Sequence, residues 1–209
     1  MKDVIAWAGL PGGKGRVVTA IAADRDHLDL VSAWWRSSPE PDAWTAGDGP
    51  ARLASLTEGR VVPGARSWIV LLGGLPLGYL ETSELGDTPL ERALVVAGVD
   101  VSSDDVVWPV HLDPSDLATE TTRQLIARSL LASALLASGV GRVFVPLAPD
   151  EDARRATCAT AGMSEVAAVQ VDGRDLVVLG CDRAAFVAAW PADMASVQVA
   201  EGSLTDRSG

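Results

Sequence analysis

Short apolar runs bounded by Gly, Pro and Asp alternate along the chain with longer amphipathic stretches. The short runs predict β-strands at residues 16–23, 67–72, 75–81, 94–101, 106–113, 143–147, 166–171 and 176–180. Gly73-Gly74 and Asp172-Gly173 each separate two such runs, and both pairs suit tight turns with positive φ. We therefore expect two hairpins. Pro109 lies inside the 106–113 run and cannot donate a ladder hydrogen bond, so we expect an irregular strand there.

The longer stretches repeat their apolar residues with a period near 3.6, which predicts helices. These are expected at residues 24–35, 51–57, 121–138, 149–161 and 184–190. In the 121–138 stretch, Ile126, Leu130 and Ala134 form one row, and Gly139 follows as a natural stop. The chain thus mixes helices and strands, which indicates an α/β (α+β) fold.

A length of 209 residues fits one domain, which we place at residues 16–190. Residues 1–15 are expected to be a flexible, glycine-rich lead-in, and residues 191–209 a loose tail. The lead-in contains Gly12-Gly13-Lys14-Gly15, but Gly15 stands where a phosphate-binding loop needs Ser or Thr. We interpret this stretch as a turn.

The charge balance favours a cationic small molecule as a partner. Lys and Arg number 17 against 28 Asp and Glu, which gives a net charge of −11. Such a chain repels polyanions, so a nucleic acid or an anionic membrane is a poor partner.

Two cysteines, Cys158 and Cys181, and two histidines, His27 and His111, are too few for a disulfide framework or a zinc site rich in these residues, so no metal is expected. The longest uncharged apolar stretch, residues 129–141, is too short to cross a bilayer, and no secretion signal is visible. We expect a cytoplasmic protein.

Four stretches resemble the GCN5-related N-acetyltransferase (GNAT) superfamily, most closely its aminoglycoside N-acetyltransferases and siderophore N-acyltransferases. The most specific is residues 68–81, WIVLLGGLPLGYLE, with its Pro-x-Gly-Tyr ending. The others are residues 18–39, Gly98-Val99-Asp100 and residues 139–163. The resemblance implies a mixed, mostly antiparallel twisted sheet flanked by helices. It also implies acetyl-CoA or another acyl thioester as the donor, with the backbone of Val110 to Leu112 holding its pantetheine arm.

The sequence departs from the family at the loop that holds the coenzyme A pyrophosphate. We place this loop near residues 118–124, ATETTRQ, which contain no glycine and add the negative charge of Glu120. Thr119, Thr121, Thr122 and Arg123 are the remaining candidate phosphate ligands. A second departure is Cys158, which aligns with a Tyr that protonates the departing thiolate in relatives. Cys158 is either that acid or a small buried residue.

The remaining candidates for chemistry lie on or near the predicted strands. His111 and Asp113 are two residues apart, so a strand would place them on one face, where His111 could accept the proton of the amine with Asp113 beside it. The alternative is a structural histidine. For the acceptor amine we select Trp44, Glu81 and Asp100. Glu81 has the alternative of a solvated strand end.

We therefore expect an N-acyltransferase that modifies an amine of a small, polar, cationic metabolite, in antibiotic modification or specialised-metabolite biosynthesis. Two alternatives stay open. The same fold could take its acyl group from a carrier-protein thioester or an aminoacyl-tRNA, or it could have lost transfer and bind a ligand only. A homodimer also stays open.

Overall fold

The computed structural model describes residues 3–9, 17–37, 54–55, 65–108, 110–112, 120–137, 140–190 and 199–203. Within these ranges one sheet runs in the order β10-β1-β2-β3-β4-β5-β7-β9-β8, and β6 pairs with β4 beside β5. Its strands are β1 (Asp3–Gly9), β2 (Val17–Ala22), β3 (Arg66–Leu72), β4 (Leu75–Glu84), β5 (Val106–Val107), β6 (Val110–Leu112), β7 (Arg142–Leu147), β8 (Ser164–Val171), β9 (Arg174–Asp182) and β10 (Val199–Ser203). Every pairing is antiparallel except that of β5 with β7. The expected mixed, mostly antiparallel sheet is confirmed.

Both expected hairpins are present, β3–β4 and β8–β9. Gly73 and Gly74 have φ of 58° and 86°, and Gly173 has φ of 78°. Glycine adopts these positive angles without the steric cost that a Cβ would add. The turn chemistry of the sequence therefore sets the register of both hairpins.

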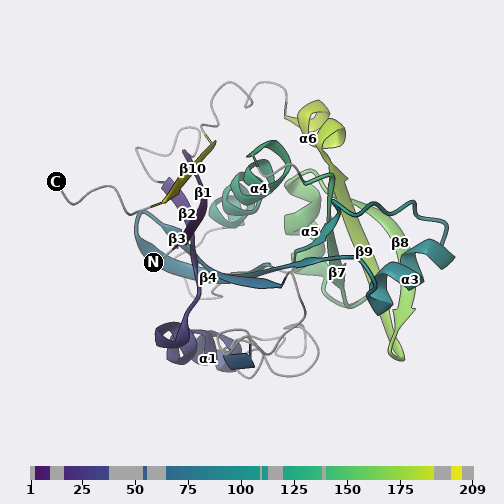
Figure 1. Cartoon of the computed structure of the whole chain (residues 1–209), viewed down its shortest axis with the longest axis horizontal. Helices are drawn as coiled ribbons and strands as arrows, with labels where there is room; N and C mark the ends of the chain where they lie inside the picture. The colour runs from purple at the N-terminus through teal and green to yellow at the C-terminus, as the bar shows by residue number, and fades with distance from the viewer. Residues whose placement is uncertain are drawn as a thin grey trace.

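Helices cover the two faces of the sheet (Figure 1). Alternate residues of β3 face opposite ways: Trp68 and Val70 join the core beneath α4 (Glu120–Ala137), whereas Ile69 packs with Val31 and Trp34 of α1 (Leu28–Ser37). Helices α5 (Asp152–Thr160) and α6 (Arg183–Ala189) lie on the α4 side, and a short 3-10 turn, η1 (Arg25–His27), precedes α1. Helix α4 therefore covers one face of the central strands, and helix α1 covers the other.

Helix α4 matches the 121–138 stretch expected from the sequence. Its buried residues include Ile126, Leu130, Leu131 and Leu135, each no more than 4% exposed. At about 25 cal/mol per Å² of buried apolar surface, this face is a large contributor to the stability of the fold. No helix in the described ranges is both long and apolar enough to span a bilayer.

The sequence prediction is wrong at residues 94–101, where a strand was expected. Residues 89–96 form helix α3 (Pro89–Val96), with Thr88 as its N-cap and Pro89 in the first turn. The hydroxyl of Thr88 accepts a hydrogen bond from the Glu91 N–H at 3.0 Å. Gly98 follows with φ of 81°. Thr88 and Pro89 are ordinary signals for the start of a helix, and Gly98 is a signal for its end. The strand was predicted because Val95 and Val96 are β-branched and follow Leu94 in one apolar run.

The two ends of the chain also differ from expectation. Residues 3–9 of the expected lead-in form β1, and residues 199–203 of the expected tail form β10, which pairs with β1. β10 is the edge strand and β1 lies between β10 and β2. Of the short helix expected at 51–57, the described residues 54 and 55 are helical.

An ion pair between the buried Asp105 and the half-buried Arg142 fixes the start of β5 against β7. Asp105 is 2% exposed and bonds to the Arg142 guanidinium, with an Oδ2–Nη2 distance of 3.1 Å. The same carboxylate accepts the Ser102 N–H, and the Asp105 carbonyl accepts the Leu85 N–H. Without Arg142, the carboxylate of Asp105 would be buried with no cation beside it, so this contact helps to hold both strands in place.

A helix and a strand at residues 89–96 predict different effects of substitutions at Leu94 and Val96. A strand places residues 94 and 96 on one face, whereas in α3 Leu94 is fully buried and Val96 is 89% exposed. Leu94→Ala is expected to lower the free energy of unfolding by about 2–5 kcal/mol. Val96→Ala, the matched control, is expected to change it by less than about 0.5 kcal/mol. Urea denaturation of the two variants measures both, and equal losses would contradict the helix.

Candidate active site

The parallel pairing of β5 with β7 is short, and the strands part beyond it. Val106 lies opposite Val143 and Val107 opposite Phe144, and the Trp108 N–H then donates to the Phe144 carbonyl at 2.8 Å. Past this point β6 pairs with β4, whereas β7 stays paired with β9 on its other side, as it is along its whole length. We call the region between β6 and residues 145–147 of β7 the strand split. Within the described residues no strand fills it, so the backbone edges that border it can bind an extended ligand.

Three sequence-predicted residues lie on β6, which forms one edge of the strand split. In its ladder with β4, Val110 pairs with Leu80, His111 with Tyr79 and Leu112 with Gly78. Trp44, Asp113 and Thr119, like Pro109, lie outside the described residues.

Glu81 and Tyr79 form a buried polar pair on the α1 side of β4. Each is 2% exposed, and the Tyr79 hydroxyl donates to Glu81 Oε2 at 3.3 Å. Tyr79 packs with Val31, Trp34 and Ile69. Because β4 continues to Glu84, Glu81 is not a solvated strand end, and that alternative is wrong. A buried carboxylate next to the strand split is a candidate ligand for an ammonium group.

Asp100 does not join this pair. It is exposed, and its carbonyl accepts a hydrogen bond from Arg142, the first residue of β7. This places Asp100 near the paired ends of β5 and β7. The described structure therefore gives no common cleft for the two carboxylates.

On the α4 side of the sheet, two buried hydrogen-bond donors lack a partner among the described residues. One is the indole N–H of Trp108, a residue 5% exposed, and the other is Nε of Arg123. Trp108 belongs to the core cluster that contains Ile126 and Leu130 of α4. Trp108 was not among the residues selected from the sequence. The available signal was its position directly before Pro109, where the strand was expected to be irregular. A buried indole N–H normally has a hydrogen-bond partner, so its lack of one is unusual.

Arg123 and Thr122 lie in the first turn of α4, and both are half-buried. A helix N-terminus offers free N–H groups and the positive end of the helix dipole, which together suit an anion. Since α4 begins at Glu120, most of the 118–124 segment expected as a loop is helical. Residues 113–119, which join β6 to α4, also contain no glycine.

Cys158 lies on α5 and is half-buried against the α4 core cluster. The pKa of its thiol is raised from 9.0 to about 11, mainly by burial; Arg154 lowers this pKa and Glu151 raises it. Cys181 is buried in β9, and burial likewise raises its pKa to about 11. Both thiols are therefore protonated at neutral pH, and neither is a nucleophile there.

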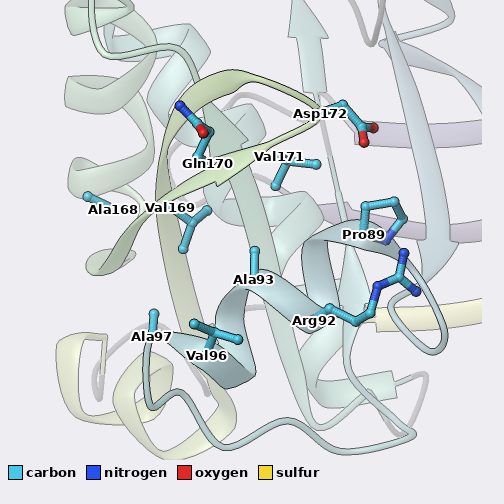
Figure 2. Close-up of a pocket in the computed structure, with 10 residues that line it drawn as sticks. All are labelled: Pro89, Arg92, Ala93, Val96, Ala97, Ala168, Val169, Gln170, Val171 and Asp172. Atoms are coloured by element: carbon cyan, nitrogen blue, oxygen red, sulfur yellow. The ribbon is translucent and has the colours of Figure 1, made fainter.

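The described residues contain no group of three or more His, Cys, Asp and Glu side chains placed to hold a metal. A groove of about 670 Å³ lies between α3 and β8 (Figure 2). Small apolar side chains, among them Ala93, Ala97 and Ala168, form much of its wall, with Arg92 and Asp172 at one end. It is at the β8 edge of the sheet, two strands from β7, and is separate from the strand split.

The thiol pKa values predict a pH dependence. Between about pH 9 and pH 11 the unfolded chain loses two thiol protons that the folded chain keeps, so stability is full below pH 9 and falls as the pH rises through this range. Alkylation by iodoacetamide at pH 7.5 should be much slower in the folded chain than in guanidinium. Equal rates in the two states would contradict the burial of both thiols.

Comparison with known proteins gives structural matches. No family model and no curated protein matches the sequence. Among solved structures, an uncharacterized protein from Bacillus halodurans matches with a TM-score of 0.70 and 9% identity, covering 88% of this chain and 93% of that one. The aminoglycoside acetyltransferase AAC(6')-Ib in complex with coenzyme A matches with a TM-score of 0.67 and 17% identity, covering 81% and 96%.

Spermidine N-acetyltransferase from Vibrio cholerae, in complex with coenzyme A and spermine, matches with a TM-score of 0.58 and 14% identity, covering 81% of this chain and 98% of that one. At these identities the matches establish architecture. The chain has a GNAT-like fold, as the sequence resemblance implied.

Proposed function

We propose that this chain is an N-acyltransferase that moves an acyl group from a thioester to an amine of a small cationic metabolite. The observation that carries the proposal is the strand split. Among the described residues no strand pairs with the two backbone edges that border it. It begins beyond Trp108, between a face with a buried carboxylate and a face that carries the N-terminus of α4. Solved structures with the same fold include acetyltransferases with coenzyme A bound.

For the donor, we propose that the pantetheine arm lies along β6 and bonds to the backbone of Val110 and Leu112. Its phosphates would then meet the first turn of α4, with Thr119, Thr121, Thr122 and Arg123 as ligands. The buried Nε of Arg123, which has no hydrogen-bond partner in the part of the chain that the structure describes, supports this placement, because an anion would accept its hydrogen bond. The glycine-free connection and its acidic residues weaken the phosphate site, so the affinity for coenzyme A should be lower than glycine-rich loops give.

For the acceptor, we propose the α1 side of the sheet, with Glu81 and Trp44 as ligands; Asp100 lies apart from Glu81, near Arg142, and is not included. Tyr79 holds Glu81 through its hydroxyl. The net charge of −11 adds a long-range attraction for cations. Structures with the same fold hold kanamycin or spermine. An acceptor with several amines suits antibiotic modification or specialised-metabolite biosynthesis in the cytoplasm.

The transfer itself needs two proton movements. The amine nitrogen attacks the thioester carbonyl carbon, the carbon–sulfur bond breaks, the nitrogen loses a proton and the thiolate gains one. We propose that His111 takes the first proton, directly or through water, with Asp113 orienting it. The backbone of His111 pairs with Tyr79 on β4, the strand that carries Glu81, and this register supports the proposal. Cys158 remains protonated at neutral pH and is the proposed source of the second proton, although its high pKa makes it a weak acid.

The donor test compares acetyl-CoA with an acetylated carrier protein, using spermine and kanamycin as acceptors. We expect transfer from at least one donor, with a Kd for coenzyme A weaker than micromolar in calorimetry. The KM for the amine should rise between 50 and 500 mM NaCl, because salt screens the attraction between charges. Micromolar binding of coenzyme A would contradict the weak phosphate site. Transfer from the carrier protein alone would identify the other donor, and transfer from neither would overturn the proposed function.

The base test is His111→Ala, with His27→Ala as the control because His27 lies in η1. A positioned base contributes about 10²–10⁴-fold in rate. We expect kcat to fall within that range at saturating substrates, with a changed pH profile, and His27→Ala to keep both. A loss below about threefold with an unchanged pH profile would make His111 structural.

A further inference from the structure

The indole of Trp108 is buried next to the strand split. It is 95% buried, and its indole N–H has no hydrogen-bond partner in the described part of the chain. An unpaired buried donor is costly, and native structures keep few of them. The N–H of Trp190, in contrast, donates to the Ala161 carbonyl at 3.2 Å. The unpartnered indole therefore marks a position where an acceptor atom is missing.

The pairing of β5 with β7 fixes the position of Trp108. Its own backbone N–H makes the last hydrogen bond between the two strands before they part. Its side chain belongs to the core cluster on the α4 side, together with Ile126 and Leu130. The chain runs from Trp108 through β6 towards the start of α4. A donor whose phosphates lie at α4 and whose arm follows β6 therefore brings its acyl end to Trp108.

We propose that the Trp108 indole N–H donates a hydrogen bond to the acyl carbonyl oxygen of the bound thioester. This inference rests on the proposed function. Negative charge builds up on that oxygen as the amine attacks, and a preorganised donor in apolar surroundings stabilises it. The side chains that share the cluster with Trp108 are hydrophobic, so water does not compete for the N–H. Trp108 is thus a catalytic residue that touches the reacting carbonyl.

The test uses S-acetylpantetheine and pantetheine, which carry the arm common to coenzyme A and carrier proteins and differ in the acyl group. Trp108→Phe removes the N–H and keeps an aromatic ring. We expect it to weaken binding of S-acetylpantetheine by about 3- to 10-fold, the value of one hydrogen bond, and to leave pantetheine binding unchanged. The kcat for acetyl transfer should fall as well. Unchanged binding of S-acetylpantetheine would overturn the proposal.

Trp190→Phe is the matched control. It removes the same atoms from a tryptophan whose N–H already donates to the Ala161 carbonyl, and it should not change the binding of S-acetylpantetheine. Weaker binding of S-acetylpantetheine by Trp190→Phe as well would mean that the loss does not depend on the Trp108 N–H. Equal weakening of pantetheine and its thioester would assign the N–H to an amide of the arm and overturn the acyl assignment.

A measurement on the wild-type chain covers the case in which Trp108→Phe does not fold. The chain has seven tryptophans, so a ¹⁵N spectrum contains seven indole signals. S-acetylpantetheine should move the Trp108 signal towards a hydrogen-bonded position, and pantetheine should not. A Trp108 signal that stays in place with bound S-acetylpantetheine would overturn the inference. If neither compound binds the wild type and neither donor supports transfer, the proposed function itself fails, and that result is distinct from the others.

Discussion

The short parallel ladder between β5 and β7 is the constraint on which the rest of the site depends. It contains two residue pairs and one further hydrogen bond, to the carbonyl of Phe144. The ion pair of Asp105 and Arg142 fixes its start, and Trp108 ends it. If the ladder were longer, β6 would pair with β7 and its backbone would not be available to a ligand. The opening between the strands is therefore produced by where the pairing ends.

The sheet also separates two chemical tasks. On the α1 side the polar pair of Tyr79 and Glu81 is buried among apolar residues. On the α4 side the core is hydrophobic up to the first turn of α4, where Arg123 and Thr122 lie. A cationic acceptor and an anionic donor would thus approach from opposite faces. Each would meet groups of opposite charge, and the two would be in contact only through the strand split.

Much of the fold could be predicted from the sequence because its signals are local. The turns at Gly73-Gly74 and Asp172-Gly173 and the apolar row of α4 each depend on residues that are close in the chain. The prediction failed at α3, where the run Leu94-Val95-Val96 suggested a strand although Thr88, Pro89 and Gly98 carry helix signals. It also missed β1 and β10, because these two strands pair with each other across almost the whole length of the chain. Trp108 was missed for a related reason: whether an indole N–H has a partner depends on the whole core.

Tyr79 is the single tyrosine of the chain, and it lies beside Glu81 at the strand split. The sequence therefore contains a natural spectroscopic label at the candidate site. Fluorotyrosine incorporated during expression would give one ¹⁹F signal, without any mutation or assignment. Because the phenol is buried and bonded to a carboxylate, that signal would respond to a cation that competes for Glu81. A library of amines could then be screened for acceptors before any acyl donor is known.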